Sequence, residues 1–165
     1  MDVAPEITQR AAVPYAGISS WATMETVGTV ADRIPEIFGW LGARGIAPAG
    51  PPFFRYHVID MSRQLLVEAG VPVATAVAEA GGDVRGGTLP AGQFAVMTHT
   101  GAPDTLMAAT AALLKWAEAR GLSWDVSQGG DGERWGCRVE FYLTNPAEQP
   151  DMTQWQTELA FRLAD

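Results

Sequence analysis

The sequence is poor in cysteine and histidine and has no long apolar run, which excludes several classes of protein. Cys137 is the only cysteine among 165 residues, so the chain can form neither an internal disulfide nor a metal site built from several cysteines. The two histidines, His57 and His99, lack partners at metal-ligand spacing, and we expect no metal and no other cofactor. No apolar stretch approaches the roughly 18 residues of a membrane span, and the first residues lack a signal sequence, so we expect a cytoplasmic protein.

Positive charge is also scarce. The chain has 11 lysines and arginines against 19 aspartates and glutamates, which gives a formal net charge of −8. A nucleic-acid binder needs a basic patch that displaces counterions from phosphates, and no three basic residues occur together here. We therefore expect neither nucleic acid nor an anionic membrane as a partner. A negative field favours cations, although the same charge could serve solubility alone.

A short motif occurs twice. Residues 40–46 and 116–122 both read W-x-x-A-R-G followed by isoleucine or leucine. Each copy ends a stretch with helical spacing of apolar residues, at 34–44 and at 104–120. Gly45 and Gly121 are suitable residues to end these helices. The repetition predicts that the chain contains the same unit twice.

Predicted strands flank both helices. They lie at 7–13, 53–58, 64–68, 93–99, 137–143 and 155–163, from their alternating or β-branched and aromatic composition. Each half then has the order β-α-β-β, with the first copy at about 5–80 and the second at about 93–165. The glycine-rich segment at about 79–92 is predicted to be a turn or linker, because it lacks the motif of a phosphate-binding loop. We expect one α+β domain over 1–165.

The strand at 137–143 carries a carboxylate on an unusual face. One face holds apolar residues including Cys137, which is predicted to fill the core, and the other holds Arg138, Glu140 and Tyr142. The polar face is either solvated or the floor of a cavity to which Glu140 gives its charge. Phe54 and Tyr56 share one face of the strand predicted at 53–58, which is the counterpart in the first half. These two residues could be part of the core or could contact a ligand.

Six tryptophans are many for a chain of this size. They are Trp21, Trp40, Trp116, Trp124, Trp135 and Trp155. Each buries about 200 Å² and needs a partner for its N–H group. Aromatic rings with a nearby acid attract cations. Each tryptophan alone suggests core packing, but the set and the net charge together indicate an apolar, negatively charged pocket.

Several segments in order resemble GyrI-like effector-binding domains, which are small-molecule-binding domains. The segments are 45–56, 67–73, 139–146, Pro150 and 155–159, and the resemblance extends from Ile7 to Leu163. Members of that family occur alone or fused to DNA-binding helices in multidrug-sensing transcription regulators. No segment of this chain resembles those helices, so the resemblance indicates a stand-alone member.

The resemblance implies a fold and a site. The fold would be a pseudo-twofold pair of βαββ units with an antiparallel sheet, two main helices and a central cleft. The site would hold a buried glutamate, which by position is Glu140. Around it the resemblance and the strand pattern suggest Tyr142, Tyr56, Phe54, Trp40, Trp116 and Trp155, and we add Trp21 and Trp135 from outside the matched segments.

Two functions follow from this resemblance. The first is binding of flat, aromatic, preferably cationic small molecules, with Glu140 as the counter-charge. Such a protein would sequester toxic compounds or report them to an unidentified regulatory protein. The alternative is a hydrolase, because some stand-alone relatives hydrolyse cyclopropane-bearing DNA alkylators. Glu140 would then be a general base with Tyr142 in support. An interaction domain without a cleft is a third possibility.

Overall fold

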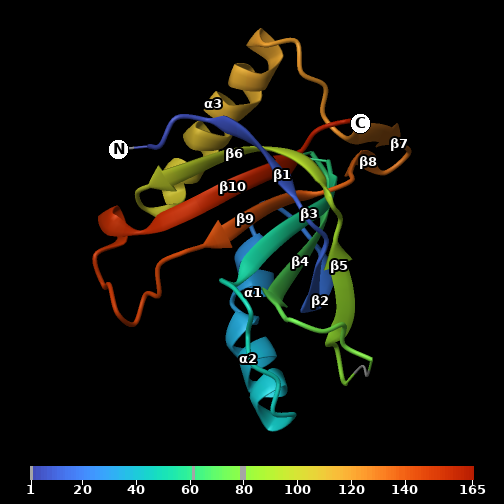
Figure 1. Cartoon of the computed structure of the whole chain (residues 1–165), viewed down its shortest axis with the longest axis vertical. Coiled ribbons are helices and arrows are strands. Elements are labelled where there is room, and N and C mark those ends of the chain that lie inside the picture. The colour runs from blue at the N-terminus through green and yellow to red at the C-terminus, as the bar shows by residue number, and fades with distance from the viewer. Residues whose placement is uncertain (1, 61, 79–80) are drawn as a thin grey trace.

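A curled antiparallel sheet and the helices that cover one of its faces make up the fold (Figure 1). The computed structural model describes residues 2–60, 62–78 and 81–165. Within them the strands are β1 (Glu6–Arg10), β2 (Val13–Ala22), β3 (Phe53–Ile59), β4 (Leu65–Pro72), β5 (Arg85–Leu89), β6 (Gly92–Thr100), β7 (Val126–Gly129), β8 (Gly132–Trp135), β9 (Arg138–Tyr142) and β10 (Gln156–Arg162). The helices are α1 (Val27–Ala31), α2 (Ile34–Ala43) and α3 (Leu106–Ala119), with 3-10 turns at Pro103–Thr105 and Met152–Gln154.

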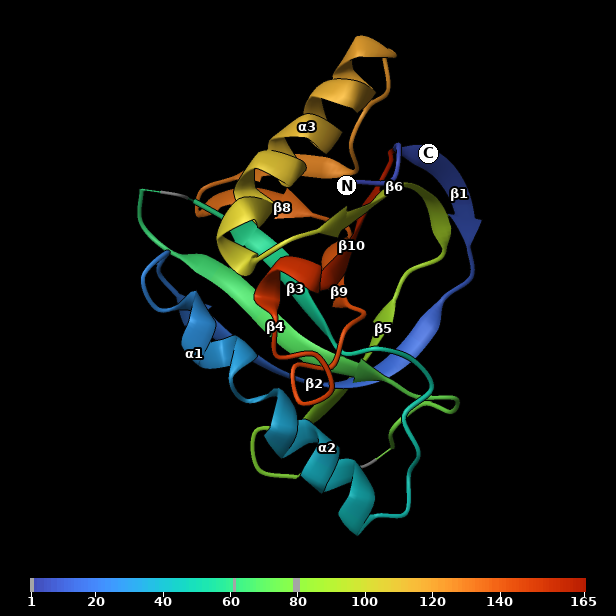
Figure 2. The ribbon, with the colours of Figure 1, turned by 90° about the vertical axis from the view of Figure 1, so that its left-hand side faces the viewer.

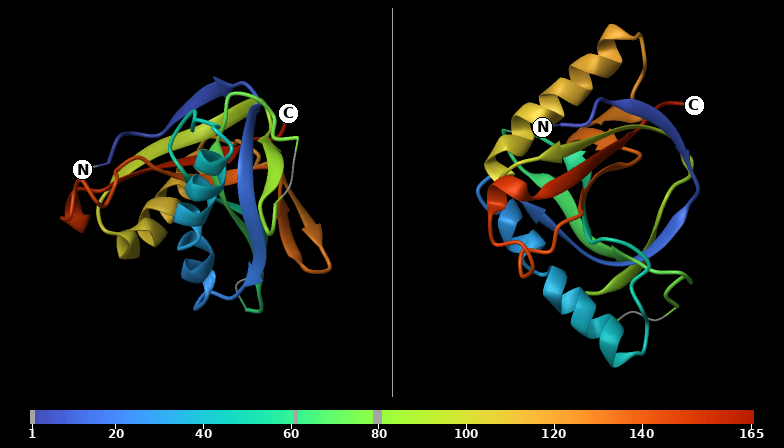
Figure 3. Two further views of the ribbon diagram at one scale, coloured as in Figure 1. Left: turned by 90° about the horizontal axis from the view of Figure 1, so that it is seen from below. Right: turned by 60° about the vertical axis from the view of Figure 1, so that its left-hand side comes forward.

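The strand order is nearly symmetric about the middle of the sheet. It is β1-β6-β10-β9-β3-β4-β2-β5, with β7 and β8 as a hairpin that pairs with β3. If β1, β2, β3 and β4 change places with β5, β6, β9 and β10, the result is the same order read from the other edge of the sheet. The edge strand of each half pairs with a strand of the other half. The chain continues from β1 at one edge to β2 near the other, and likewise from β5 to β6, which curls the sheet (Figure 3). The expected α+β class with an antiparallel sheet and two main helices is confirmed.

Both main helices end in the same way. The backbone N–H of Ile46 donates to the carbonyl of Leu41 at 3.0 Å, and that of Leu122 donates to Ala117 at 3.0 Å. Between these groups the glycines at positions 45 and 121 adopt left-handed conformations with φ of 67° and 69°. This is the Schellman arrangement, in which the glycine turns the chain and the last helical carbonyls keep partners.

The repeated motif also places an arginine on each tryptophan. The guanidinium carbon of Arg44 lies 3.9 Å from the ring centre of Trp40, and that of Arg120 lies 4.3 Å from the ring centre of Trp116. Residues four apart on a helix are neighbours on its surface, so the spacing alone brings these pairs together. The W-x-x-A-R-G motif therefore specifies a stacked and glycine-terminated helix end.

Several elements differ from the sequence prediction. The strand expected at 7–13 ends at Arg10 as β1. A second strand, β2, follows it before the first helix. Residues 85–89 of the glycine-rich segment form β5, which pairs with β2. A Cβ atom at Gly87 would lie 2.5 Å from the ring of Tyr15, so glycine lets the two strands approach. The glycine content of residues 85–89 suggested a turn, but Gly87 allows this segment to pack closely as a strand of the sheet.

The two faces of the sheet bury separate apolar clusters. One lies between the sheet and the helices and includes Ile37, Leu41 and Leu113, which confirms the predicted inner faces of both main helices. Figure 2 shows α1, α2 and α3 on this side of the sheet, and we call it the helix face. The other cluster lies inside the curl and contains side chains from strands and their connections, including Phe53, Phe94 and Cys137. None of the helices in the described residues is long and apolar enough to cross a membrane.

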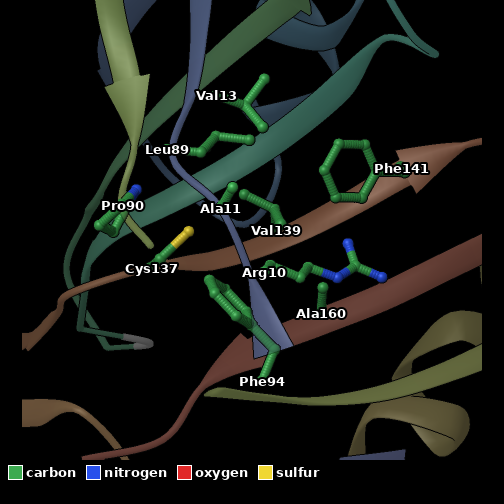
Figure 4. A pocket seen from close by; sticks show the side chains of 10 residues that line it. All are labelled: Arg10, Ala11, Val13, Leu89, Pro90, Phe94, Cys137, Val139, Phe141 and Ala160. Atoms are coloured by element: carbon green, nitrogen blue, oxygen red, sulfur yellow. The ribbon is translucent and has the colours of Figure 1, made fainter. Parts of the chain in front are cut away.

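A small cavity lies inside the curl (Figure 4). Its volume is about 30 Å³, and it is lined mainly by apolar side chains with Arg10 at one side and Cys137 at the base. This volume is close to that of one liquid water molecule, so the cavity is too small for a drug-sized ligand. Burial raises the pKa of the Cys137 thiol to about 11. The thiol is therefore a buried core group, as the sequence predicted.

Candidate functional site

Glu140 lies in the middle of the helix face on β9. Cross-strand pairing places it in one row of side chains that runs across six strands. From β6 to β2 the row consists of Met97, Leu159, Glu140, Phe54, Ala69 and Ile18. Glu140 is the only charged member of this row and is 9% exposed. The solvated-face interpretation is therefore wrong for this residue, and the sheet holds its carboxyl group in apolar surroundings.

Two tyrosine hydroxyls interact with this carboxyl group. The hydroxyl of Tyr142 donates to Oε1 of Glu140 at 3.3 Å, and the hydroxyl of Tyr56 from β3 is close enough to help lower the pKa of the carboxyl group. Burial raises the pKa of Glu140 to about 7, although the charge of Arg138 and the tyrosine hydroxyls oppose this rise. Burial and the nearby carboxylate raise the pKa values of both tyrosines. The carboxyl group therefore changes its protonation near neutral pH, while the tyrosines stay neutral donors.

Arg138 is the site residue that the sequence analysis left without a role. It lies two residues before Glu140 on the same face, and its guanidinium carbon is 4.7 Å from the ring centre of Phe161 and 4.8 Å from that of Trp135. The ring of Tyr56 follows at 5.8 Å. Strand alternation already placed Arg138 beside Glu140. The rings around it could not be predicted, because they depend on the pairing of β9 with its neighbours.

The structure brings Phe54 and Trp135 to this region as packed aromatic residues. Phe54 is buried opposite Glu140, and its ring lies edge-on to Tyr56 with centroids 5.3 Å apart. Trp135 is buried against Trp124 and Phe161, with centroid distances of 5.7 and 6.0 Å. The buried indole N–H groups of both tryptophans have no hydrogen-bond partner among the described residues. These residues give the carboxyl group and Arg138 an aromatic environment.

Of the remaining tryptophans, Trp40 and Trp116 are partly buried against the apolar cluster of the helix face, whereas Trp21 is not. Trp21 is 45% exposed, and strand alternation from Ile18 puts it on the opposite face of the sheet from Glu140. Trp40 lines a separate groove of about 370 Å³ with Arg44, Ile46 and residues 76–78. Glu140 does not line this groove, nor the cavity inside the curl.

Trp116 and Trp155 are each fixed by a nearby group. Trp116 lies under Arg120 at the end of α3. Trp155 precedes β10, two residues before Thr157, which pairs with Tyr142. Its indole N–H donates to the carbonyl of Gln149 at 2.7 Å. Trp155 is therefore near the Tyr142 end of the strand pair, whereas Trp116 is engaged by its own helix.

A second polar cluster lies on the face inside the curl. Tyr15 donates to Oε1 of Glu68 at 2.6 Å and accepts from Arg55 at 3.1 Å. Nε2 of His57 is 2.8 Å from the same Glu68 oxygen. Arg55 also donates to the carbonyls of Thr88 and Gly136. Because these groups bond to one another and join β2, β3, β4, β5 and the turn at Gly136, we interpret the cluster as structural. Within the described ranges no three histidine, cysteine or acidic side chains gather as a metal site would require.

Comparisons with known proteins agree with this architecture. The family model of the GyrI-like small molecule binding domain matches residues 4–164. The chain superposes on EcmrR from a complex with DNA with a TM-score of 0.77 and 17% identity, covering 98% of this chain and 57% of that chain. It superposes on SAV2435 bound to tetraphenylphosphonium (TM-score 0.66, 10% identity, 98% of this chain and 94% of that one). It also superposes on a hydrolase from Listeria innocua (TM-score 0.66, 12% identity, 97% and 91%).

These identities support the shared fold alone. The chain spans little more than half the length of the EcmrR chain, and no curated protein matches its sequence. The family model covers nearly every residue, including the strands that carry Glu140 and both tyrosines. The chain belongs to the GyrI-like family of small-molecule-binding domains.

Proposed function

We propose that the chain binds flat aromatic small molecules, preferably organic cations, on the helix face, with Glu140 as the counter-charge. The observation that carries this proposal is the buried carboxyl group of Glu140 in an otherwise apolar row of side chains. A desolvated carboxylate is costly without a partner, and an aromatic cation would supply both charge and ring stacking. A relative of the same fold with bound tetraphenylphosphonium supports the choice of ligand class.

We also propose that the ligand binds where two copies of one unit meet. The central strands β3 and β9 hold equivalent places in the symmetric strand order. α2 packs mainly on β2 and β4, and α3 packs on β6, so the two main helices flank this central pair. Superposition of residues 6–72, which hold β1 to β4, on residues 85–162, which hold β5, β6, β9 and β10, tests the duplication. Helices that fall on different faces after superposition would contradict it.

Ligand entry requires the side chains around Glu140 to move, since only 9% of this residue is exposed. Binding would then select an open form, and the apparent affinity would fall in proportion to the population of that form. Once bound, the ligand would be sequestered from solvent. The protein would act as a buffer for toxic compounds or as a sensor that reports them to a regulatory protein.

A hydrolase is the second candidate, and the pKa of Glu140 near 7 favours it. A general base works best when its pKa is close to the operating pH. Glu140 would take a proton from water while the resulting hydroxide adds to a cyclopropane carbon of the ligand, and the ring C–C bond at that carbon would break with its electron pair passing to a conjugated ligand oxygen. Tyr142 would donate a hydrogen bond to that oxygen, and Glu140 would return the proton to the opened product. A hydrolase of the same fold supports this candidate.

The binding test compares Glu140→Gln with the wild type by fluorescence titration with tetraphenylphosphonium. The substitution keeps the shape and removes the charge, so we expect at least a tenfold loss, which is about 1.4 kcal/mol. Glu118→Gln on the exposed surface of α3 removes the same charge elsewhere and should change nothing. Equal affinity of all three proteins would overturn the role of Glu140.

The hydrolase test uses a cyclopropane-bearing alkylator. Mass spectrometry would detect addition of one water molecule with the wild type. Turnover that disappears in Glu140→Gln would support catalysis. If the wild type binds the alkylator without converting it, the hydrolase candidate is wrong and the binding function remains.

A further inference from the structure

We propose that Arg138 is the residue that sets the charge preference of the Glu140 site, because it holds a protein cation in the aromatic cage beside the carboxyl group. The cage consists of the rings of Trp135, Phe161 and Tyr56. The inference rests on the proposed function and concerns the ligand class of the same site. It predicts that Arg138 reduces the preference of the site for a permanent cation over a neutral aromatic ligand with an acceptor oxygen.

The first argument is geometric. Ring centres 4.7, 4.8 and 5.8 Å from the guanidinium carbon of Arg138 are within the distance at which aromatic faces attract a cation. Aromatic cages of this kind also bind ammonium and other onium ligands. Arg138 therefore occupies the surroundings that a cationic ligand would use.

The second argument is that Arg138 lacks a close carboxylate. Among the described residues, Arg10, Arg33, Arg134 and Arg162 form ion pairs with acidic side chains, and Arg138 forms none. Its Nε atom is buried without a hydrogen-bond partner. The half-buried guanidinium has no salt bridge and contacts the rings by cation–π attraction, so a competing cation or a ligand acceptor can change its position.

The third argument is that Tyr56 links Arg138 to the carboxyl group. The Tyr56 ring faces the guanidinium, and the Tyr56 hydroxyl acts on the pKa of the Glu140 carboxyl group. A ligand that reaches the carboxyl group therefore meets the edge of the cage. Arg138, with Glu140 and the more distant Glu133 as nearby acids, offsets the negative charge of the site. A permanent cation meets repulsion there, whereas a neutral acceptor meets the Nε–H group of Arg138, which has no partner among the described residues.

The experiment compares two probes of similar shape, tetraphenylphosphonium and the neutral triphenylphosphine oxide. Arg138→Met keeps much of the length and apolar volume and removes the charge. We expect it to raise the affinity for tetraphenylphosphonium at least tenfold and to lower the affinity for the phosphine oxide. Arg138→Lys keeps the charge and should resemble the wild type. Calorimetric titration measures the affinities of the wild type and both variants for both probes, and thermal unfolding checks that the variants fold.

A measurement on the wild type keeps the inference testable if Arg138→Met does not fold. The Arg138 Hε proton lies near the aromatic rings, so its NMR signal should be shifted in the free protein. Tetraphenylphosphonium should move this signal toward its position in unfolded peptides, because the guanidinium leaves the cage. A signal that stays unchanged at saturation would overturn the inference.

The outcomes also separate this inference from the proposed function. If Glu140→Gln weakens cation binding but Arg138→Met leaves it unchanged, the function stands and the role of Arg138 is wrong. Equal losses for both probes in Arg138→Met would make Arg138 a structural residue and overturn the inference. If neither probe binds the wild type or Arg138→Met, the proposed function and the inference both fail.

Discussion

Glu140 on β9 lies directly opposite Phe54 on β3, across the central strand pair of the sheet. The carboxyl group therefore faces a buried phenyl ring rather than a basic partner, and its ionised form is disfavoured in the folded protein. Its pKa is about 7 in the native state, against 4.5 for an ordinary glutamate. The native state thus binds a proton that the unfolded chain has already released between these pH values.

The first prediction follows from this difference. The contribution of Glu140 to stability is fully present below about pH 4.5, falls as the pH rises, and is lost above about pH 7. Glu140→Gln should therefore gain stability relative to the wild type over this interval, by an amount of the order of 3 kcal/mol. Urea unfolding at several pH values measures the difference. A difference that does not vary with pH would show that the carboxyl group is solvated.

The second prediction concerns two glycines of the first main helix that should respond with opposite signs. Gly45 ends α2 with φ of 67°, so Gly45→Ala should destabilise the protein by about 1 kcal/mol. Gly39 lies within α2, and no atom lies within 4 Å of a Cβ built there. Gly39→Ala should stabilise the protein by about 0.5–1 kcal/mol. Thermal unfolding of both variants checks this, and effects of equal sign would contradict the assigned helix end.

The elements that the sequence predicted well are those with strong local periodicity. The helices α2 and α3 carry apolar residues at helical spacing over several turns, and β6 and β10 carry apolar runs of strand length. β2 was not predicted, because Gly17, Ser19 and Ser20 give it no clear alternation. β5 was not predicted as a strand, because it contains glycines, one of which, Gly87, allows close packing against Tyr15.

The site was predictable only in part for a related reason. Alternation along β9 was enough to put Glu140, Tyr142 and Arg138 on one face. The burial of that face depends on which strands pair with β9 and on the helices beside them, and these are tertiary features. By contrast, the four-residue spacing of tryptophan and arginine in the repeated motif was a local signal for their stacking.

The third prediction tests the inner face of α3. Leu113 is fully buried, so Leu113→Ala should cost about 2–5 kcal/mol in the free energy of unfolding. Met107 lies on the same helix and is 66% exposed, and Met107→Ala should stay within about 0.5 kcal/mol of the wild type. Urea unfolding measures both variants. If the two substitutions cost the same, the helix packs by another face.

The fourth prediction separates the structural cluster inside the curl from the ligand site on the helix face. Tyr15→Phe removes a hydroxyl that donates to Glu68 at 2.6 Å and accepts from Arg55 at 3.1 Å. The ring that packs edge-on against Phe53, with centroids 4.9 Å apart, is kept. Arg55 retains its bond to the carbonyl of Thr88. The cost should therefore be that of one buried hydrogen-bonding group, about 1–3 kcal/mol.

Glu68→Ala should cost more, because it removes the carboxylate that bonds both Tyr15 and His57, and each buried group left without its partner costs about 1–3 kcal/mol. Neither variant touches the helix face, so their affinity for tetraphenylphosphonium at a temperature where both are folded should equal that of the wild type. Urea unfolding and fluorescence titration of the same samples give the two quantities. Weaker ligand binding by Tyr15→Phe at unchanged stability would mean that this cluster belongs to the ligand site, and the assignment of binding to the Glu140 face would then be wrong.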